Sequence, residues 1–262
     1  MCNMRTNIRI SPLSLDIANV VESIPTIFEN NSVSEILHEG RNEIRYFKEL
    51  GGGLVVKKFV KITLFNRLIY SFLRKSKAER SFENACSLID RGFLTPLPVA
   101  YIERKRWGIL YDQYYICSFS SWPSLFELFS GEPHEDTKYI IDACISFIAS
   151  LHKGGIVHFD LNPSNILYHV DDDGTISFEL IDLNRMLFMK KQPPLSLLLK
   201  NLTRMTENDK MYCYIVYRYI YNMELRPYST IIRCMFNKIR RNRRCRFKKE
   251  MRKLRRSGFT VH

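Results

Sequence analysis

Three polar residues near the centre of the chain stand out because their neighbours are apolar. Residues 157–185 read VHFDLNPSNILYHVDDDGTISFELIDLNR and contain Asp160, Asn165 and Asp182. A carboxylate beside buried strands costs free energy unless it has a partner or a chemical task. Asp160 and Asn165 are five positions apart in a loop expected between a helix and a strand. A loop this compact can turn both side chains toward one point.

These residue types suit phosphoryl transfer. That reaction needs a carboxylate near the attacking hydroxyl, oxygen ligands for magnesium and a cation on the nucleotide phosphates. Asp160 would orient the acceptor hydroxyl and take its proton. Asn165 would give an amide oxygen to Mg²⁺, and Asp182, which ends the strand after a β-hairpin, would give a carboxylate. The stretch therefore predicts a site for ATP and Mg²⁺.

The same stretch resembles the catalytic and metal-binding loops of the protein-kinase-like fold. The pattern is His-x-Asp-Leu-x-x-x-Asn at 158–165, followed by Ile-Leu and then by Ile-Asp at a strand end. It is most similar to the lipopolysaccharide core kinase family, the Kdo-kinase-like and InaA-like proteins of Gram-negative bacteria. That family has a similar Asp-Leu-Asn/Ser-Pro-x-Asn-Ile-Leu loop and an Ile-Asp-x-x-Arg after the hairpin. The resemblance spans residues 35–190.

The resemblance also implies a lysine and a glutamate in the first lobe. The third strand, VVKKF, should carry the lysine that reaches the nucleotide phosphates, and Lys57 fits the pattern. Alternation along a strand places Lys58 on the opposite face. The expected ion-pair partner of Lys57 is Glu83 on the following helix, with Glu79, one turn earlier, as the reserve.

Two further nucleotide contacts follow from the resemblance. The loop over the phosphates would be Gly40-Arg41-Asn42-Glu43, which is poor in glycine and so a weak match. Residues 114–117, with Tyr115, would form the strand against adenine, although an ordinary core strand would have the same sequence. Gly40 and Tyr115 are therefore the cofactor-binding candidates besides Lys57 and Glu83.

Departures from protein kinases bear on the acceptor. Protein kinases have a lysine two places after the catalytic aspartate, where this chain has Asn162. Leu183-Asn184 replaces the Phe-Gly that follows the metal-binding aspartate, and no Ala-Pro-Glu segment occurs. Sugar and antibiotic kinases of this fold also lack that lysine. These differences favour a small hydroxylated acceptor over a regulated protein kinase.

The pattern of apolar residues predicts an α+β chain with two lobes. The first lobe would be an antiparallel sheet of five strands with a helix inserted after the third. The strands are expected at 33–40, 43–50, 54–60, 99–103 and 107–119, with the helix over 64–92. The second lobe would be mostly helical. It would contain a central helix over 136–155, a hairpin over 166–182 and a helix that begins near Thr206. Four regions result: an N-terminal extension (1–32), the first lobe (33–119), the helical lobe (120–239) and a basic tail (240–262).

Most of the formal charge of +13 lies in the tail. Residues 240–256 contain eleven Lys or Arg and one acidic residue, Glu250. Such a tail could bind an anionic membrane surface or simply be solvated, and we do not expect nucleic acid as the partner. The seven cysteines are scattered without metal-ligand spacing, and no apolar run is long enough to span a membrane. We expect a soluble cytoplasmic chain that can associate with the inner membrane.

The sequence thus predicts an ATP-dependent phosphotransferase acting on a hydroxyl of a lipopolysaccharide core sugar at the inner membrane surface. Two alternatives stay open. One is a small atypical Ser/Thr protein kinase. The other is a non-catalytic pseudokinase that binds membrane or nucleic acid, in which the loop at Asp160 is only structural. The sequence does not identify the acceptor, the oligomeric state or the ligand of the tail.

Overall fold

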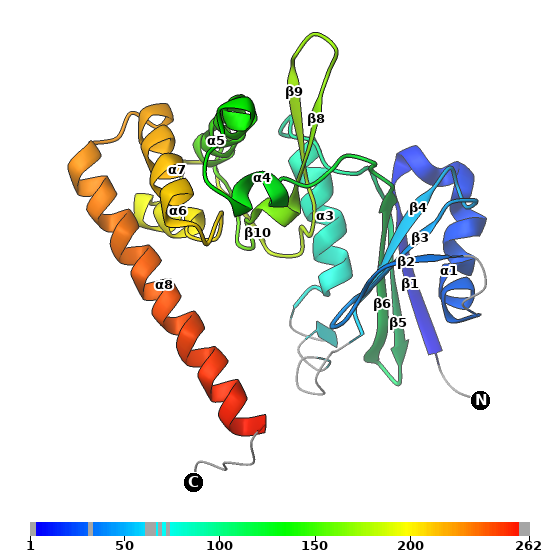
Figure 1. The fold of residues 1–262 in the computed structure, drawn as a ribbon. Helices are drawn as coiled ribbons and strands as arrows, with labels where there is room; N and C mark the ends of the chain where they lie inside the picture. Colours follow the sequence, from blue (N-terminus) through cyan, green and yellow to red (C-terminus); the bar gives the residue numbers. More distant parts are fainter. Residues whose placement is uncertain (1–3, 31–33, 61–66, 68–69, 72–73, 257–262) are drawn as a thin grey trace. The chain divides into compact units, whose positions relative to one another are not determined.

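A computed structural model of the chain describes residues 4–30, 34–60, 67, 70–71 and 74–256. The chain divides into two units (Figure 1). The first contains Met1–Pro123 and Glu179–Met186, and the second contains Ser124–Phe178 and Leu187–His262. The short segment 179–186 thus belongs to the first unit although it follows most of the second in sequence. Each unit is described by itself.

The first unit is built on a six-stranded antiparallel sheet with the order β1-β5-β6-β4-β3-β2. The strands are β1 (Met4–Ile10), β2 (Glu35–Glu39), β3 (Glu43–Phe47), β4 (Leu54–Lys58), β5 (Pro98–Arg106) and β6 (Ile109–Ser118). The five strands expected from the sequence are all present. The turn between β5 and β6 differs, because it lies at Trp107-Gly108 rather than at Arg104–Arg106. Both turn residues have positive φ, as a two-residue type I′ hairpin requires.

Residues 1–32 were expected to be a separate extension, and this differs from the structure. β1 pairs with β5 along its whole length, from Met4 opposite Arg106 to Ile10 opposite Ala100. After a 3₁₀ turn (Pro12–Ile17), α1 (Ala18–Asn30) packs Val21, Ile24 and Phe28 against one face of the sheet. This was missed in the sequence because α1 contains Pro25 and β1 is polar and mostly exposed.

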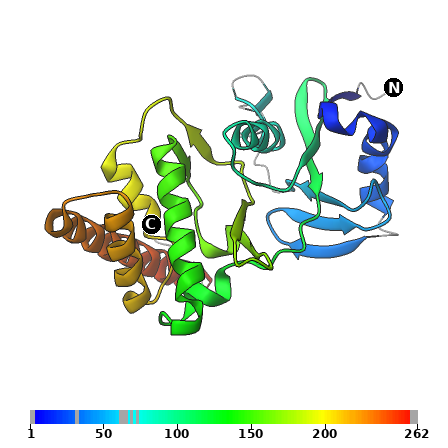
Figure 2. The same ribbon diagram turned by 90° about the horizontal axis from the view of Figure 1, so that it is seen from above.

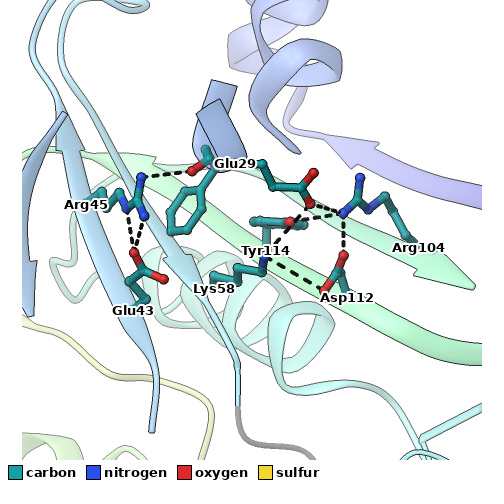
Figure 3. A network of polar contacts seen from close by, with 8 residues as sticks. Glu29, Glu43, Arg45, Lys58, Arg104, Asp112 and Tyr114 are labelled. Carbon is teal, nitrogen blue, oxygen red and sulfur yellow. Dashed lines mark hydrogen bonds and ion pairs between the residues drawn. The ribbon is translucent and has the colours of Figure 1, made fainter. Parts of the chain in front are cut away.

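A network of ionic contacts fixes the C-terminal end of α1 on the sheet (Figure 3). Arg45 donates a hydrogen bond to the carbonyl oxygen of Phe28 at 2.8 Å, and its guanidinium lies over the Phe28 ring. Arg104 pairs with both Glu29 and Asp112. These contacts come from three strands and one helix, so they join the N-terminal segment to the body of the first unit.

The other face of the sheet is covered by α3 (Lys77–Ile89). Ser76 caps this helix by accepting a hydrogen bond from the Glu79 amide at 3.1 Å, and Gln113 of β6 accepts another from the Ala78 amide at 3.0 Å. Phe82 and Ala78 pack on Phe59, Tyr101 and Tyr115 of the sheet. The helix expected over 64–92 is thus confirmed in its second half. Its first half lies largely outside the described residues.

The second unit is mainly helical (Figure 2). Its helices are α4 (Phe126–Ser130), α5 (Lys138–Lys153), α6 (Leu195–Leu202), α7 (Asp209–Asn222) and α8 (Pro227–Arg256), with short 3₁₀ turns at Glu135–Thr137 and Pro163–Asn165. Strands β7 (Ile156–His158) and β10 (Met186–Phe188) pair, as do β8 (Ile166–Val170) and β9 (Ile176–Leu180). α5 is the expected central helix. It packs against α7, and α8 packs against α6 and α7.

Two expectations for this unit need correction. α7 begins later than expected, because Asn208 rather than Thr206 caps it, by accepting a hydrogen bond from the Met211 amide at 3.0 Å. The basic tail is not a separate region either, since residues 240–256 continue a helix that begins at Pro227. All six cysteines of the described part of the chain are free. No helix within that part is long and apolar enough to cross a membrane.

Candidate active site

Lys57 and Asp182, which are 125 positions apart in sequence, meet in the first unit. Lys57 Nζ donates a hydrogen bond to Asp182 Oδ1 at 2.6 Å, and the lysine is 8% exposed. Asn184 Nδ2 donates to the same carboxylate oxygen at 2.5 Å. A buried ammonium needs a counter-charge, and the strand-end aspartate supplies it.

The backbone around Asp182 is held by the segment that connects α3 to β5 and by α3 itself. Thr95 Oγ1 donates to the carbonyl oxygen of Leu180 at 2.7 Å, and Asn84 Nδ2 of α3 donates to that of Leu183 at 2.6 Å. Asp182 itself has φ 58°, in the left-handed region that few non-glycine residues adopt. Aspartate is among the residues that tolerate this conformation, and such strain often occurs at functional positions.

Lys57 and Lys58 lie on opposite faces of the sheet. Lys57 is on the face covered by α3, with Nζ 5.4 Å from the centre of the Phe59 ring. Lys58 is on the α1 face, 3.9 Å from Glu29 and 4.0 Å from Asp112 (Figure 3). Lys58 thus belongs to the network that holds α1, which leaves Lys57 as the lysine beside Asp182.

The expected ion pair between Lys57 and Glu83 is wrong for this structure. Glu83 pairs with Lys75, and its Oε1 lies 3.9 Å from Arg9. The reserve, Glu79, has Lys75 at 4.0 Å. Phe82 packs on the sheet and so fixes the rotation of α3. The next residue, Glu83, therefore points toward Lys75 rather than toward Lys57.

Lys77 is a residue of this site that the sequence did not single out. It is the first residue of α3, and its Nζ lies 5.6 Å from the centre of the same Phe59 ring that Lys57 contacts. Burial lowers the pKa of Lys77, and the neighbouring charges of Arg80 and Lys57 lower it further. A helix N-terminus that carries clustered cations is suited to phosphate groups. The signal in the sequence is the run of basic residues over 74–80, which reads RKSKAER and includes Lys77.

The two weaker cofactor candidates have ordinary positions in the sheet. Gly40 lies in the turn between β2 and β3, as expected. Tyr115 lies opposite Lys57 in the register of β4 and β6, but its side chain is buried against α3. Burial accordingly raises the pKa of Tyr115 well above its ordinary value. Only its backbone could then contribute to a nucleotide site.

Asp160 and Asn165 meet in the second unit. The Nδ2 atoms of Asn162 and Asn165 both donate to the carbonyl oxygen of Asp160, at 2.8 and 2.9 Å. His158 Nδ1 accepts a hydrogen bond from the Asp160 amide at 3.1 Å. His158 therefore supports the loop, and the backbone amide and carbonyl of Asp160 are both hydrogen-bonded.

A chain of buried hydrogen bonds through Asn201, His152 and Tyr219 supports the loop at His158. Asn201 Nδ2 donates to the carbonyl oxygen of His158 at 2.8 Å, so its Oδ1, 3.1 Å from His152 Nε2, must accept from that nitrogen. His152 Nδ1 then accepts from the Tyr219 hydroxyl at 2.7 Å, which requires a neutral imidazole. Burial lowers the pKa of His152 to about 4. Helices α5, α6 and α7 thus jointly position the loop.

Arg204 is the second residue that the sequence did not reveal. It lies just after α6, and its Nη1 pairs with Asp160 Oδ1. Arg204 is thus the cation beside the candidate catalytic carboxylate, while Asn162 stands where protein kinases have lysine. The two residues are 44 positions apart, and no local pattern connects them.

A comparison with protein families identifies the family to which this chain belongs. The family described as "Lipopolysaccharide kinase (Kdo/WaaP) family" matches residues 41–210, which include Lys57, Asp160, Asn165 and Asp182. The chain belongs to this family. The family predicted from the sequence is thus confirmed, and the chain is a kinase of the lipopolysaccharide core. The family implies ATP as the phosphoryl donor. A search of curated proteins found no match.

One solved structure agrees with this Kdo/WaaP kinase in fold. A structure entitled "WaaP in complex with acyl carrier protein" covers 92% of this chain and 98% of its own, with a TM-score of 0.55 and 17% identity. It confirms the predicted α+β, protein-kinase-like fold. Two structures of Rio2 kinase from Chaetomium thermophilum have 17% identity and lower TM-scores. The one described as an ADP/Mg²⁺-phosphoaspartate complex has 0.45, covering 78% of this chain and 60% of its own. The other has 0.47, covering 76% and 61%.

The donor set of this kinase fits magnesium rather than a metal bound by protein alone. No group of three or more His, Cys, Asp or Glu that could hold a metal ion occurs among the described residues. Magnesium, however, is often bound by one or two protein oxygens together with phosphates and water. Asn165 uses its Nδ2 in the bond to Asp160, so its Oδ1 is the atom suited to a cation. Asp182 offers the carboxylate. Because these two residues lie in different units, their convergence stays a prediction.

Proposed function

We propose that this kinase transfers the γ-phosphoryl group of ATP to a hydroxyl of a lipopolysaccharide core sugar in a magnesium-dependent reaction. The observation that carries the proposal is the Lys57–Asp182 pair, since the fold joins a cation for phosphate to a carboxylate for metal. Lys57 would bind the nucleotide phosphates, and Lys77, at the start of the adjacent helix, would add a second positive charge.

Asp160 would act on the acceptor. Its carboxylate would orient the sugar hydroxyl and accept its proton as the oxygen–phosphorus bond forms. The bond between the γ-phosphorus and the bridging oxygen breaks at the same time, and ADP leaves. The hydrogen bonds from Asn162 and Asn165 hold the Asp160 backbone, and Arg204 holds its side chain. Positioning of this kind contributes much of the rate of phosphoryl transfer.

Asn165 and Asp182 would hold the magnesium ion. When bound, the ion neutralises charge on the β- and γ-phosphates. Asp182 would then exchange part of its contact with Lys57 for the metal, while Lys57 turns to phosphate oxygens. Asn184, which donates to the same carboxylate, would keep Asp182 oriented during this exchange.

A small hydroxylated acceptor fits the loop better than a protein. The position two places after Asp160 is occupied by Asn162, whose side chain caps the turn and donates to Asp160. We place the reaction on the cytoplasmic side of the inner membrane, where a core sugar linked to lipid would be presented. Phosphorylation of serine or threonine in added proteins is the alternative that the experiment must separate.

The decisive experiment incubates the purified chain with ATP, Mg²⁺ and core oligosaccharide from which phosphate has been removed. Mass spectrometry should show an increase of one phosphate on the sugar and none on added proteins. Asp160→Asn should lower kcat by about 10²–10⁴-fold while nucleotide binding is retained, because the carboxylate acts on the acceptor. Transfer to protein but not to sugar, or full activity of the variant, would overturn the proposal.

A further inference from the structure

The inference concerns α8 and rests on which of its faces is covered. In its first half, Thr230, Cys234 and Lys238 are buried, at 2%, 0% and 3% exposed. Lys238 donates to the carbonyl oxygen of Thr206, and Tyr212 of α7 donates to that of Cys234 at 3.1 Å. Arg241, on the same side, pairs with Glu207. This side of α8 therefore faces α6 and α7, which fixes the rotation of the helix.

The opposite side of α8 carries large apolar side chains in contact with solvent. On this side lie Tyr228 (85%), Ile232 (69%), Phe236 (64%), Ile239 (53%) and Phe247 (63%), while Ile231 (38%) projects to a flank of the helix. At 3.6 residues per turn, the first five project within a sector of roughly 100°. We call them the apolar stripe. The C-terminal half of α8, which carries Phe247, extends beyond α6 and α7 (Figure 1).

Basic residues accompany the apolar stripe along the helix. Arg233, Arg240 and Arg244 follow one border of it, at spacings of seven and four residues. Arg243 and Arg246 project within the stripe itself, where long arginine side chains can extend their charged ends to the polar boundary. A helix of this composition, apolar on one face and rich in arginine beside it, is typical of helices that lie in a membrane interface.

We propose that α8 docks this kinase on an anionic lipid bilayer, with the apolar stripe inserted and the neighbouring arginines on the lipid headgroups. Charge complementarity identifies the partner as anionic. The apolar stripe identifies it as a bilayer rather than a nucleic acid, because binding to phosphates alone requires no phenylalanine or isoleucine on the contact face. The covered side, at Thr230, Cys234 and Lys238, stays on α6 and α7.

This surface goes beyond the proposed reaction, and the two can fail independently. Transfer to a soluble core oligosaccharide tests the site at Asp160 and needs no membrane. Binding to vesicles tests α8 and needs no nucleotide. A chain that binds vesicles but does not phosphorylate the oligosaccharide contradicts the proposed reaction. A chain that phosphorylates the oligosaccharide but does not bind vesicles contradicts the proposed role of α8.

The test measures sedimentation of the full chain with vesicles of phosphatidylcholine, alone or mixed with phosphatidylglycerol. The wild-type chain should bind only the mixed vesicles. Ile232→Ser combined with Phe236→Ser should weaken this binding at least about tenfold, because it removes inserted apolar area. Arg240→Gln combined with Arg244→Gln should weaken it as well. The matched control, Trp107→Ser, changes an exposed apolar residue (71%) of the first unit and should bind as the wild type does.

A second variant keeps the proposal testable if the serine variant does not fold. Phe236→Trp places a fluorophore in the stripe, and its emission should shift to the blue and be quenched by brominated lipid in mixed vesicles. Unchanged emission would overturn the proposal. It would also be overturned if the wild-type chain does not bind mixed vesicles, if the folded serine variant binds as well as the wild type, or if a duplex DNA oligonucleotide is bound in preference to vesicles.

Discussion

Each carboxylate proposed to act in this kinase has a cationic partner. Asp182 is paired with Lys57 in the first unit, and Asp160 is paired with Arg204 in the second. Both carboxylates are only partly exposed, with side chains 32% and 23% accessible, so each partner limits the cost of burial. Substrates would then enter by exchanging partners. The pairing fixes the rotamers of the reacting groups before any substrate arrives.

The two neighbouring lysines of β4 give a matched pair of variants. Lys57→Met should lower kcat/KM for ATP by about 10²-fold or more, because it removes the positive charge that binds the phosphates and lies beside Asp182. Lys58→Met removes the same charge one residue away. It should change stability only, since Lys58 contacts Glu29 and Asp112 on the α1 face. Equal losses of activity in the two folded variants would contradict the role of Lys57.

Arg204 is expected to be a positioning residue for Asp160. Arg204→Ala should lower kcat by about 10²-fold with little change in KM for ATP, because misplacement of a reacting group is costly. Arg204→Lys should recover only part of the rate, since a lysine cannot present the two parallel donors of a guanidinium. Added guanidinium ion should raise the rate of the alanine variant. A variant that folds normally but does not respond to guanidinium would indicate a structural role alone.

At the scale of elements, the sequence predicted what depends on local pattern. Alternation along β2 to β6 placed Lys57, and the expected central helix and hairpin placed Asp160 and Asp182, on the segments where the structure has them. The pairing of β1 with β5 was missed because the strand is polar and its partner is about ninety residues away. The partner of Lys57 was missed because contacts of Phe82 with the sheet, which spacing along the helix does not reveal, set the rotation of α3.

The hydrogen-bonded chain through His152 makes the second unit sensitive to acid. The unfolded histidine takes up a proton near pH 6.5, and the buried one only near pH 4. Its pKa is lowered on folding, so its contribution is fully present above about pH 6.5 and is lost as the pH falls toward 4. Between pH 7 and 5 the free energy of unfolding should fall by about 2 kcal/mol from this group alone.

Denaturation by urea at both pH values checks this effect. His152→Gln can still bond to Asn201 and Tyr219 but does not titrate. Its stability should therefore fall by about 2 kcal/mol less than that of the wild type between the two pH values, whatever its stability at pH 7. The same decrease in both proteins would mean that His152 is not the group that takes up the proton.

At the scale of the whole molecule, the candidate site residues are divided between the two units. Lys57, Lys77 and Asp182 belong to the first, and Asp160, Asn165 and Arg204 to the second. The segment 179–186 leaves the second unit, contributes Asp182 to the first and returns. Neither unit alone carries both of the proposed magnesium ligands, so the proposal requires that binding of Mg-ATP depends on residues of both units. Sequence spacing predicts which residues take part, and this stays a prediction, because no local pattern can set the position of one unit on the other.

A double-mutant cycle tests whether one ion joins the two units. Asn165→Ala and Asp182→Ala should each weaken binding of Mg-ATP. If both residues hold the same magnesium ion, the double variant should lose less than the sum of the two, with a coupling of about 0.5–3 kcal/mol. Calorimetry with ATP in the presence of a chelator provides the control, because without the ion the two effects should be additive. Additivity in magnesium as well would mean that Asn165 and Asp182 do not share a ligand, and the predicted convergence of the two units would be wrong.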